Sequence, residues 1–538
     1  MVSFAPGRGT RNPLPDVEEP EGKKEGEGWW KGTAFKMFEA AMTTAASITV
    51  LGIVGYSYNR YYKHLVLSKM ENAFAPGDPV LELAAQSHAY HVAEDAAKRR
   101  ALRESVQARR DADGADPTDH DHWLPRAEQA KIDRIVAGDE VGHYHLLIGE
   151  KGTGKSSMLI DAMSKVDGEG IAMFDAHADV EIFRVRLGKA LDFEYHEDNI
   201  GSLFSIRGPR DASALLDVER ALNKLEKVAL KRRRAGKKPL VLIVNSMHLL
   251  RDDDDGRDLL ELVQQRAELW AASTLATVVF NSDDYWVYER LKQYSTRMEV
   301  TPVGDLPKDK ALDALKRYRM RNFGEEPDGD VLEKVYESVG GRLTFLSRVA
   351  KNKDMLKVCE DINEREKTWF LNQTWILGEE MDDDVMDQQK YASAAMVLAK
   401  ALVDKEREMA ATYDAKSGHI LPSLPLWQAR QVMTRADFIQ SYDHINIFTI
   451  DSKANVRADS VPMMNAFRDV CSREGFDEHL EKTLTRIGDI ESLGRTREVT
   501  IKDLWEGGKY RVVMRDAKGR VQGETTFETV EKKDDGDD

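Results

Sequence analysis

GEKGTGKS, residues 149–156, is the stretch of sequence that decides the fold. It fits the phosphate-loop pattern G-x-x-x-x-G-K-[ST], in which glycines let backbone N–H groups face phosphate oxygens. In such a loop the lysine, here Lys155, places its charge on the β- and γ-phosphates, and the hydroxyl of the serine, here Ser156, ligates Mg²⁺. The helix that begins there adds the positive end of its dipole. The motif therefore predicts ATP and Mg²⁺ as cofactors, with the nucleotide bound by Gly149, Glu150, Lys151, Gly152, Thr153, Gly154, Lys155, Ser156 and Ser157.

The sequence around the loop alternates between short apolar runs and helical patterns. We expect strands at Tyr144–Ile148, Gly170–Phe174, Leu240–Val244 and Leu275–Phe280, and helices at Ser156–Val166 and Ala212–Arg234. Apolar runs this short suit strands that are buried on both faces of a parallel sheet. The predicted fold class is α/β, a P-loop NTPase with crossover helices.

A second feature concerns hydrolysis. P-loop ATPases carry an Asp, and often a Glu beside it, at the end of another buried strand; the Asp holds Mg²⁺ through water and the Glu orients the attacking water. Here Leu240–Val244 is followed by Asn245 and Ser246. Asn245 can still bond a metal-bound water, but it brings no charge, and Ser246 cannot act as a base. The sequence predicts nucleotide binding with slow or absent hydrolysis.

Three further groups are candidates for the missing chemistry. Asp175 ends another predicted strand and could supply a carboxylate, as could the acidic loop Asp252–Asp255, for which a solvated turn is the simpler interpretation. Leu275–Phe280 ends in Asn281-Ser282, and Asn281 could contact the γ-phosphate or could cap the strand.

Composition limits the other classes of function. The 538 residues suffice for two to four domains, and the net charge of −16 does not favour a nucleic-acid partner. The basic run Lys231–Lys238 could meet acidic lipid or nucleic acid, but such a run more often ends a helix. Cys359 and Cys471 are the two cysteines, too few for a disulfide framework and expected to be core thiols. Histidines and acids within 111–122 lack any fixed ligand spacing, so this stretch is interpreted as a linker.

The N-terminal region contains 19 uncharged residues, Ala40–Tyr58. As a helix they would span about 28 Å, close to the thickness of a bilayer core. Tryptophans before the stretch and tyrosines after it suit the two interfaces. The alternative is a buried Ala-rich core helix. The stretch predicts a single-pass membrane protein, with nearby Lys and Arg too evenly divided to set the orientation.

The order of these parts resembles the AAA+ and STAND superfamily, especially archaeal-type and Orc1-like ATPases. Four segments carry the resemblance: Trp123–Glu128 resembles the Arg-x-Glu entry segment, Thr277–Ser282 the sensor-1 strand, Arg297–Val300 the segment that closes the core, and Gly340–Leu343 the Gly-Gly motif of the lid. The resemblance implies that Arg297 could act in trans as an arginine finger and that Arg342 could be a sensor-2 charge. Leu343 stands where this family often has Pro.

A winged helix is expected after the lid, over Tyr391–Glu474. A helix would begin at Thr434–Asp437 with an acceptable cap, Ile445–Ile450 and Asn455–Arg457 would form the wing, and Pro462–Cys471 the closing helix. Thr434–Ile445 holds one Arg and two Asp, so no basic recognition helix is evident. A membrane span, a degenerate ATPase and a winged helix together most resemble fungal membrane-anchored AAA proteins. Gly340–Thr344 is also similar to the mitochondrial escape protein family of the inner membrane, which implies that location.

The chain is therefore expected to contain several parts. They are a disordered N-terminus (1–39), a transmembrane helix (40–62), a helical stalk and linker (63–122), a P-loop AAA+-like core (123–307), a helical lid (308–388), a winged helix (389–475), and a C-terminal helix, β-hairpin and acidic tail (476–538). The leading hypothesis is a membrane-anchored ATP-binding switch or scaffold that works with a protein partner or as a homo-oligomer. The alternatives are an active ATPase that remodels protein or nucleic acid, and a non-catalytic membrane adaptor.

Overall fold

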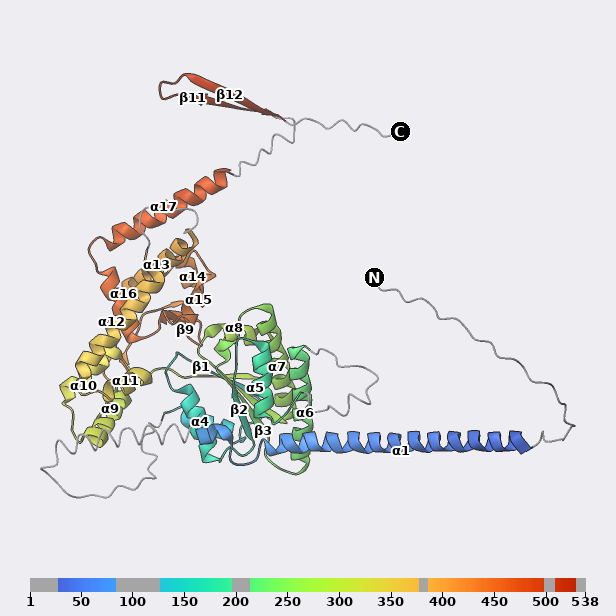
Figure 1. Ribbon diagram of the computed structural model, residues 1–538. Coiled ribbons are helices and arrows are strands. Elements are labelled where there is room, and N and C mark those ends of the chain that lie inside the picture. Colours follow the sequence, from blue (N-terminus) through green and yellow to red (C-terminus); the bar gives the residue numbers. More distant parts are fainter. Residues whose placement is uncertain (1–27, 84–125, 196–212, 377–385, 498–508, 529–538) are drawn as a thin grey trace, which may run out of the picture. The chain divides into compact units, whose positions relative to one another are not determined.

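The computed structural model describes residues 28–83, 126–195, 213–376, 386–497 and 509–528 (Figure 1). Most of the expected N-terminus, the stalk beyond residue 83, the linker, Trp123–Pro125 and the acidic tail lie outside these residues. The described chain divides into two units, one holding the N-terminal helix up to Ser68 and the other holding the remaining described elements.

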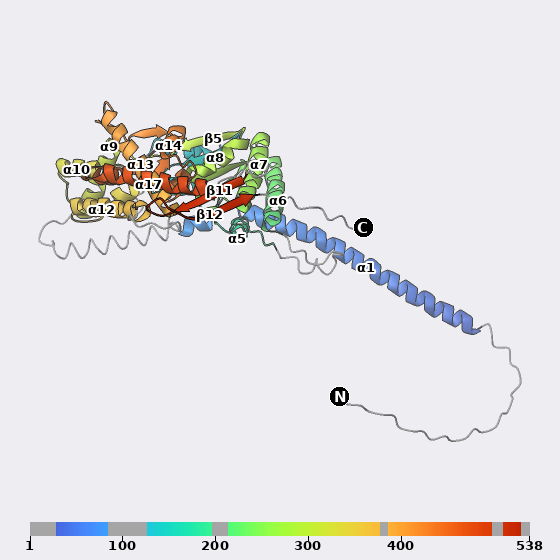
Figure 2. The ribbon, with the colours of Figure 1, turned by 90° about the horizontal axis from the view of Figure 1, so that it is seen from above.

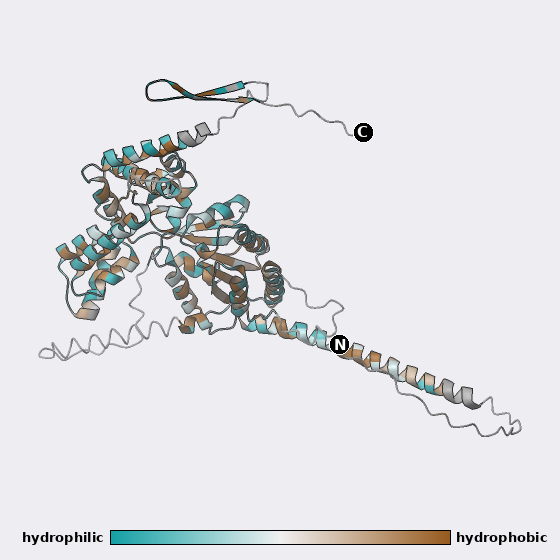
Figure 3. Cartoon of the chain, turned by 45° about the horizontal axis from the view of Figure 1, so that its top comes forward, coloured by the Kyte–Doolittle hydropathy of each residue, from teal (hydrophilic) through white to brown (hydrophobic). Residues whose placement is uncertain are grey.

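Helix α1 runs over Gly28–Asn72 and contains the predicted membrane span. Its 45 residues would extend about 68 Å at 1.5 Å per residue, more than a bilayer core requires. Among the described residues, α1 is the helix long and apolar enough to cross a membrane. Large apolar side chains along it, such as Phe38, Ile48 and Leu51, are exposed, and Figure 3 shows this apolar stretch in brown.

A five-stranded parallel sheet lies at the centre of the second unit, with strand order β2-β3-β4-β1-β5. The strands are β1 (Tyr144–Ile148), β2 (Ile171–Asp175), β3 (Leu240–Asn245), β4 (Ala276–Ser282) and β5 (Met298–Pro302). Four of them were predicted, and each differs from the prediction by two residues or fewer at its ends. All residues of β1, β3 and β4 are buried, as the continuous apolar runs indicated.

Helices cover the sheet (Figure 1, Figure 2). They are α3 (Gln129–Val136), α4 (Lys155–Lys165), α5 (Val180–Ala190), α6 (Ala214–Arg234), α7 (Asp254–Ser273) and α8 (Tyr285–Tyr294). Side chains alternate between the faces of each strand. Leu147 and Ile243 accordingly join the core formed with α3 and α4, whereas Tyr144 points the other way and accepts a 2.9 Å hydrogen bond from Gln264 of α7.

Four helices form the predicted lid: α9 (Lys308–Phe323), α10 (Gly329–Val339), α11 (Leu343–Ala350) and α12 (Met355–Thr374). They enclose their own apolar core, which includes Leu315, Val335 and Val349. Cys359 is buried in this core. Helix α12 also packs on the next part of the chain, where the rings of Phe370 and Phe467 lie 4.8 Å apart.

The next part has the predicted winged-helix order. Its helices are α13 (Met386–Glu408), α14 (Leu426–Met433), α15 (Phe438–His444) and α16 (Val461–Cys471), and an antiparallel sheet β8-β10-β9 lies among them. Strands β9 (Phe448–Ile450) and β10 (Asn455–Ala458) are the predicted wing, while β8 (Ser423–Pro425) and the small hairpin β6 (Tyr413–Asp414) with β7 (Gly418–His419) were not predicted.

One prediction in this part is wrong. Thr434–Asp437 does not provide a capped helix start: Thr434 ends α14 in a left-handed conformation, and Asp437, which precedes α15, makes no capping hydrogen bond. Thr434 instead donates its hydroxyl to Met433 O, at 2.6 Å. The polar residues here form the turn between two helices.

The last described elements are helix α17 (Phe476–Arg497) and the predicted hairpin, β11 (Lys509–Arg515) with β12 (Val521–Glu528). Gly519 has a φ of 78° and lies in its turn. The two cysteines form no disulfide, as predicted; Cys359 is buried and Cys471, at the end of α16, is partly buried.

Candidate nucleotide site

The phosphate loop lies where the motif predicts, between the end of β1 and the start of α4. Gly152 and Gly154 have φ values of 82° and 96°, which side-chain-bearing residues rarely adopt. A Cβ at Gly152 would also lie 2.5 Å from Thr344 Oγ1, and one at Gly154 would lie 2.7 Å from Leu343 Cδ1. Both neighbours belong to lid helix α11, so the start of that helix lies directly against the loop.

The ammonium group of Lys155 is held inside the loop. It donates to Gly149 O at 2.7 Å and to Glu150 O at 2.8 Å, and it forms a 2.8 Å ion pair with Asp283. The side chain is 3% exposed. The charge that a phosphate would require is thus already neutralised by a carboxylate. Sequence reasoning missed Asp283, although this acid directly follows the predicted sensor strand.

A chain of side chains joins the serine of the loop to the ends of three strands. Ser156 Oγ donates to Asn245 Oδ1 at 2.9 Å, and Asn245 Nδ2 donates to Asp175 Oδ1 at 2.6 Å. Asn281 Nδ2 donates to Ser156 Oγ at 3.1 Å and to Asn245 Oδ1 at 2.5 Å. Asp175 and Asn245 are direct partners in the register of β2 and β3. The candidates Asn245, Asn281 and Asp175 therefore converge on the predicted magnesium ligand.

These groups fit a nucleotide with Mg²⁺. The serine hydroxyl, an amide oxygen and a carboxylate are oxygen ligands of the kind that Mg²⁺ prefers, and Asn281 Oδ1 is buried without a hydrogen-bond partner among the described residues. The loop brings the lysine and backbone amides of a phosphate cradle. The charge of the metal site would come from Asp175, one strand away from the position where ATPases usually carry it.

Arg342 reaches the loop but is occupied by protein groups. This side chain is 2% exposed and forms ion pairs with Asp305, at 2.5 Å, and with Asp459, at 3.0 Å. It also donates to Lys151 O in the phosphate loop at 2.9 Å. Arg342 lies beside the loop, and its two carboxylate partners connect the lid to the core and to the winged helix. Its role as a sensor-2 charge stays a prediction.

The winged helix contacts the loop through a second arginine. Arg457 of β10 forms an ion pair with Glu150, whose other oxygen, Oε2, is buried and has no hydrogen-bond partner among the described residues. Burial raises the pKa of nearby Asp459 above its usual value even though Arg342 lies beside it. Neither Arg457, in the wing, nor Asp459, just after it, was predicted as a site residue, because both meet the loop only through tertiary structure.

The segment after β4 forms a third junction with the winged helix. Asp443, which is buried, accepts the backbone N–H groups of Tyr285, at 2.8 Å, and Ile450, at 3.2 Å, and burial raises its pKa well above the usual value. His444 Nδ1 lies 2.7 Å from Asp284 Oδ2, and this hydrogen bond raises the pKa of His444. Asp284 directly follows Asp283, the partner of Lys155.

Other predicted residues lie around or away from the site. Arg126 is buried and connects the phosphate loop to the segment after β5. It donates hydrogen bonds to Thr153 O at 2.6 Å and to Gly304 O at 2.5 Å. Ser157 is exposed on α4. Arg297 is exposed just before β5, at the opposite end of the sheet from the loop of its own chain. A role for Arg297 in a neighbouring copy stays a prediction.

The charged runs have local partners. In the acidic loop, Asp252 pairs with Arg257 at 2.8 Å and with Arg290 at 3.2 Å, so it does not face the phosphate loop as a substitute carboxylate. In the basic run, Lys231 pairs with Glu71 at 2.6 Å and Lys238 with Asp139 at 2.6 Å. The run ends α6, where cations suit the helix dipole.

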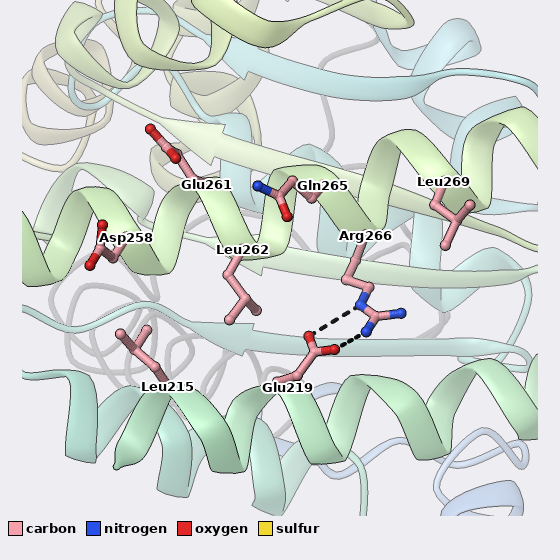
Figure 4. A pocket seen from close by; sticks show the side chains of 8 residues that line it. All are labelled: Leu215, Glu219, Asp258, Glu261, Leu262, Gln265, Arg266 and Leu269. Atoms are coloured by element: carbon pink, nitrogen blue, oxygen red, sulfur yellow. Dashed lines mark hydrogen bonds and ion pairs between the residues drawn. The ribbon is translucent and has the colours of Figure 1, made fainter.

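A shallow groove lies elsewhere, between α6 and α7 (Figure 4). Leucines line it together with acids, and across it Arg266 forms an ion pair with Glu219. None of the phosphate-loop residues lines this groove. Figure 4 shows Glu261 and Asp258 projecting from α7 and no cluster of groups suited to a phosphate.

Comparison with protein families gives a match over residues 372–491, to the family described as fungal AAA protein, C-terminal winged helix domain. Residues 372–491 are similar to the C-terminal winged helix of fungal AAA proteins. The matched range covers Arg457 and Asp459, the residues through which this winged helix meets the phosphate loop. No curated protein sequence matches the chain.

Solved structures align with 66% to 71% of this chain at low identity. A Walker-type ATPase of Pyrococcus abyssi aligns at 13% identity with a TM-score of 0.43, covering 66% of this chain and 99% of that one. AMPPCP-bound DnaA from Aquifex aeolicus aligns at 12% identity with a TM-score of 0.30, covering 71% and 100%. The RuvB Holliday junction branch migration motor of Thermotoga maritima aligns at 12% identity with a TM-score of 0.30, covering 66% and 98%.

Proposed function

We propose that this chain is a membrane-anchored ATP-binding switch with slow or absent hydrolysis. The observation that carries the proposal is the set of contacts from lid and winged helix to the phosphate loop itself, through Arg342 to Lys151 O and through Arg457 to Glu150. A triphosphate in the loop would have to displace Asp283 from Lys155 and compete with these contacts. Nucleotide occupancy would thereby change how core, lid and winged helix are held together.

Slow hydrolysis follows from the residues beyond β3. Asn245 carries no charge, and Ser246, which has a left-handed φ of 56°, has no carboxylate to orient water. An active ATPase that remodels protein or nucleic acid is the second candidate, and Asp175 is the observation in its favour, since its carboxylate lies 2.6 Å from the Asn245 amide. One carboxylate can support Mg²⁺, but catalysis also needs a positioned base.

The test is ATP affinity and turnover measured on the full chain in detergent with Mg²⁺. We expect saturable ATP binding by calorimetry that Lys155→Ala abolishes. Lys165→Ala, which removes a lysine at the exposed end of the same helix, should leave it unchanged. We expect steady-state turnover far below typical enzyme rates, which are about 1–1,000 per second. Turnover at ordinary rates that depends on Lys155 would favour the active ATPase, and absence of binding would leave only a membrane adaptor.

Membrane attachment is the second part of the proposal. It is supported by the length of α1 and by the exposed apolar side chains along it. We propose the mitochondrial inner membrane as the location, on the resemblance of Gly340–Thr344 alone, and a protein partner or a second copy of the chain as the interaction that the switch controls. Carbonate extraction of purified mitochondria should leave the full chain in the membrane pellet and release a chain lacking residues 28–68. Recovery of the full chain in the soluble fraction would contradict the anchor.

A further inference from the structure

A cluster of metal-ligating side chains lies at the opposite end of the sheet from the phosphate loop. His145 is the second residue of β1, Glu299 is its direct partner in β5, and Glu140 precedes β1. A ring nitrogen of His145 and one carboxylate oxygen from each glutamate lie within 4.8 Å of one another. Two distant parts of the sequence, residues 140–145 and Glu299, are thus brought to one point.

The histidine of this cluster lacks a hydrogen-bond partner. His145 is 1% exposed, and neither Nδ1 nor Nε2 has a partner among the described residues. Its nearest ion-pair contact, from Nδ1 to Glu299 Oε2, measures 3.6 Å and is too long for a hydrogen bond. Leaving a buried polar group without a hydrogen-bond partner destabilises the folded state. A ligand that accepts an imidazole lone pair would remove this destabilisation.

Two cationic side chains each form an ion pair with one carboxylate oxygen of these glutamates. Lys131 Nζ lies 3.1 Å from Glu299 Oε2, and Arg134 Nη2 lies 2.9 Å from Glu140 Oε1. The second oxygen of each carboxylate takes no part in these ion pairs. Groups that hydrogen-bond a ligating carboxylate in this way commonly fix its direction in metal sites.

We propose that His145, Glu140 and Glu299 bind a divalent transition-metal ion of the zinc class. One imidazole and two carboxylates are a ligand set that zinc accepts, with water in the fourth position. The hard cations Mg²⁺ and Ca²⁺ prefer oxygen ligands throughout, so the histidine disfavours them. Small side-chain rotations must draw the donor atoms together, because zinc holds them about 2.0–2.2 Å from the ion.

A metal here would join β1 to the edge strand β5. Val303, directly after β5, donates its N–H to Ile148 O at 2.8 Å, and Asp305 two residues later pairs with Arg342. The ion would therefore fix the strand that leads to the junction of lid and phosphate loop. This role is structural and separate from the magnesium of the nucleotide.

The experiment uses the full chain without a histidine tag, purified in detergent and stripped with a chelator. Zinc is the probe, measured by calorimetry and by metal content after dialysis. We expect one zinc ion per chain, and an affinity at least about 10-fold weaker in His145→Asn and Glu299→Gln. His177→Asn and Glu181→Gln change the same residue types outside the cluster and should bind as the parent does.

Two further readouts keep the test decisive if the buried histidine variant misfolds. Glu140→Gln alters a partly buried ligand, and zinc should raise the Tm of the parent but not of this variant. Bound Co²⁺ should show a visible absorption band that all three ligand variants lose. The proposal is overturned if the parent binds no stoichiometric zinc, or if the ligand variants bind it as tightly as the parent, as they would if the histidines of 111–122 held the ion.

Discussion

Arg457, in the last strand of the winged helix, forms an ion pair with Glu150, the second residue of the phosphate loop. The two residues are 307 positions apart in the sequence. Glu150 is 6% exposed at its side chain, so the pair lies largely out of water. A buried carboxylate depends strongly on its counter-charge. The winged helix therefore contributes directly to the electrostatics of the nucleotide loop.

Arg457→Met should destabilise the protein strongly because it leaves the Glu150 carboxylate buried without a charge partner. We expect a loss of about 3 kcal/mol in the free energy of unfolding. The double variant Glu150→Gln with Arg457→Met should recover most of this loss, since no buried charge remains. Denaturant unfolding of the parent, the two single variants Glu150→Gln and Arg457→Met, and the double variant measures the coupling. As a control, Arg317→Met removes an exposed ion pair and should change the free energy of unfolding by close to zero. Additive single effects would contradict the interpretation.

Asn245→Asp should expose the electrostatic role of Asp175. The substitution replaces an amide donor, 2.6 Å from Asp175 Oδ1, with a second carboxylate. We expect a loss of about 1–3 kcal/mol in stability without Mg²⁺ and a larger gain on adding Mg²⁺ than in the parent. Thermal unfolding with and without Mg²⁺ measures both.

Exchange of the two residues, Asp175→Asn with Asn245→Asp, provides the matched control. It keeps one amide and one carboxylate, so the magnesium-free stability should return toward that of the parent. ATP turnover should stay low in both variants because Ser246 still offers no base. If the Asn245→Asp variant were as stable as the parent in the absence of Mg²⁺, Asp175 and residue 245 would not interact.

Gly152→Ala should lower the free energy of unfolding by more than backbone strain alone would. Gly152 and Gly236 both have positive φ, at 82° and 70°, but a Cβ at Gly236 meets nothing within 4 Å, whereas one at Gly152 meets Thr344. Each substitution carries a strain of about 1–2 kcal/mol. Gly152→Ala should lose a further ~1–3 kcal/mol through overpacking against the lid. Adding Thr344→Ala should restore most of that difference; equal losses for the two glycine variants would place the lid away from the loop in solution.

The His444–Asp284 pair should give a pH dependence to the junction between the segment after β4 and the winged helix. Asp284 raises the pKa of His444 above its ordinary 6.5, so the folded state binds this proton more tightly than the unfolded state. The stabilisation is complete below the ordinary value and disappears as pH rises through the raised folded value. Because the imidazole is 61% exposed, we expect at most about 1 kcal/mol.

The measurement compares unfolding free energies of the parent and His444→Gln. Their difference should be largest near about pH 6 and vanish at alkaline pH. In an Asp284→Asn background the same comparison should show no such change with pH, because the partner is gone. A difference that grows with pH would reverse the assigned sign.

Local patterns were sufficient to predict much of the fold. Strand β1 was predicted from a buried apolar run. The phosphate loop and α4 were predicted from the glycines, lysine and serine of the phosphate-loop pattern. The wing strands and the closing helix were predicted from the resemblance to a winged helix. The failure at Thr434–Asp437 has a local cause: polar residues suit a turn between two helices as well as a helix start, and the competing helix α14 lies immediately before them.

The contacts that complete the site were beyond local patterns. Lys155 pairs with Asp283 and Arg342 with Asp459 only because folding brings residues 117 to 128 positions apart together. Asn245 was predicted to act through a water, yet its amide also orients Asp175 across two strands. Register between β2 and β3 decides this, and a sequence does not show register between strands 70 positions apart.

The two thiols of this chain have a practical consequence for studying its movements. Burial raises the pKa of Cys359 and of Cys471 to about 12, so both remain protonated, and poor nucleophiles, at neutral pH. A cysteine introduced at an exposed position of the lid and another on α14 would therefore be the reactive ones. Fluorophores attached there could report the distance between lid and winged helix as ATP is added, on a chain whose own cysteines need not be removed.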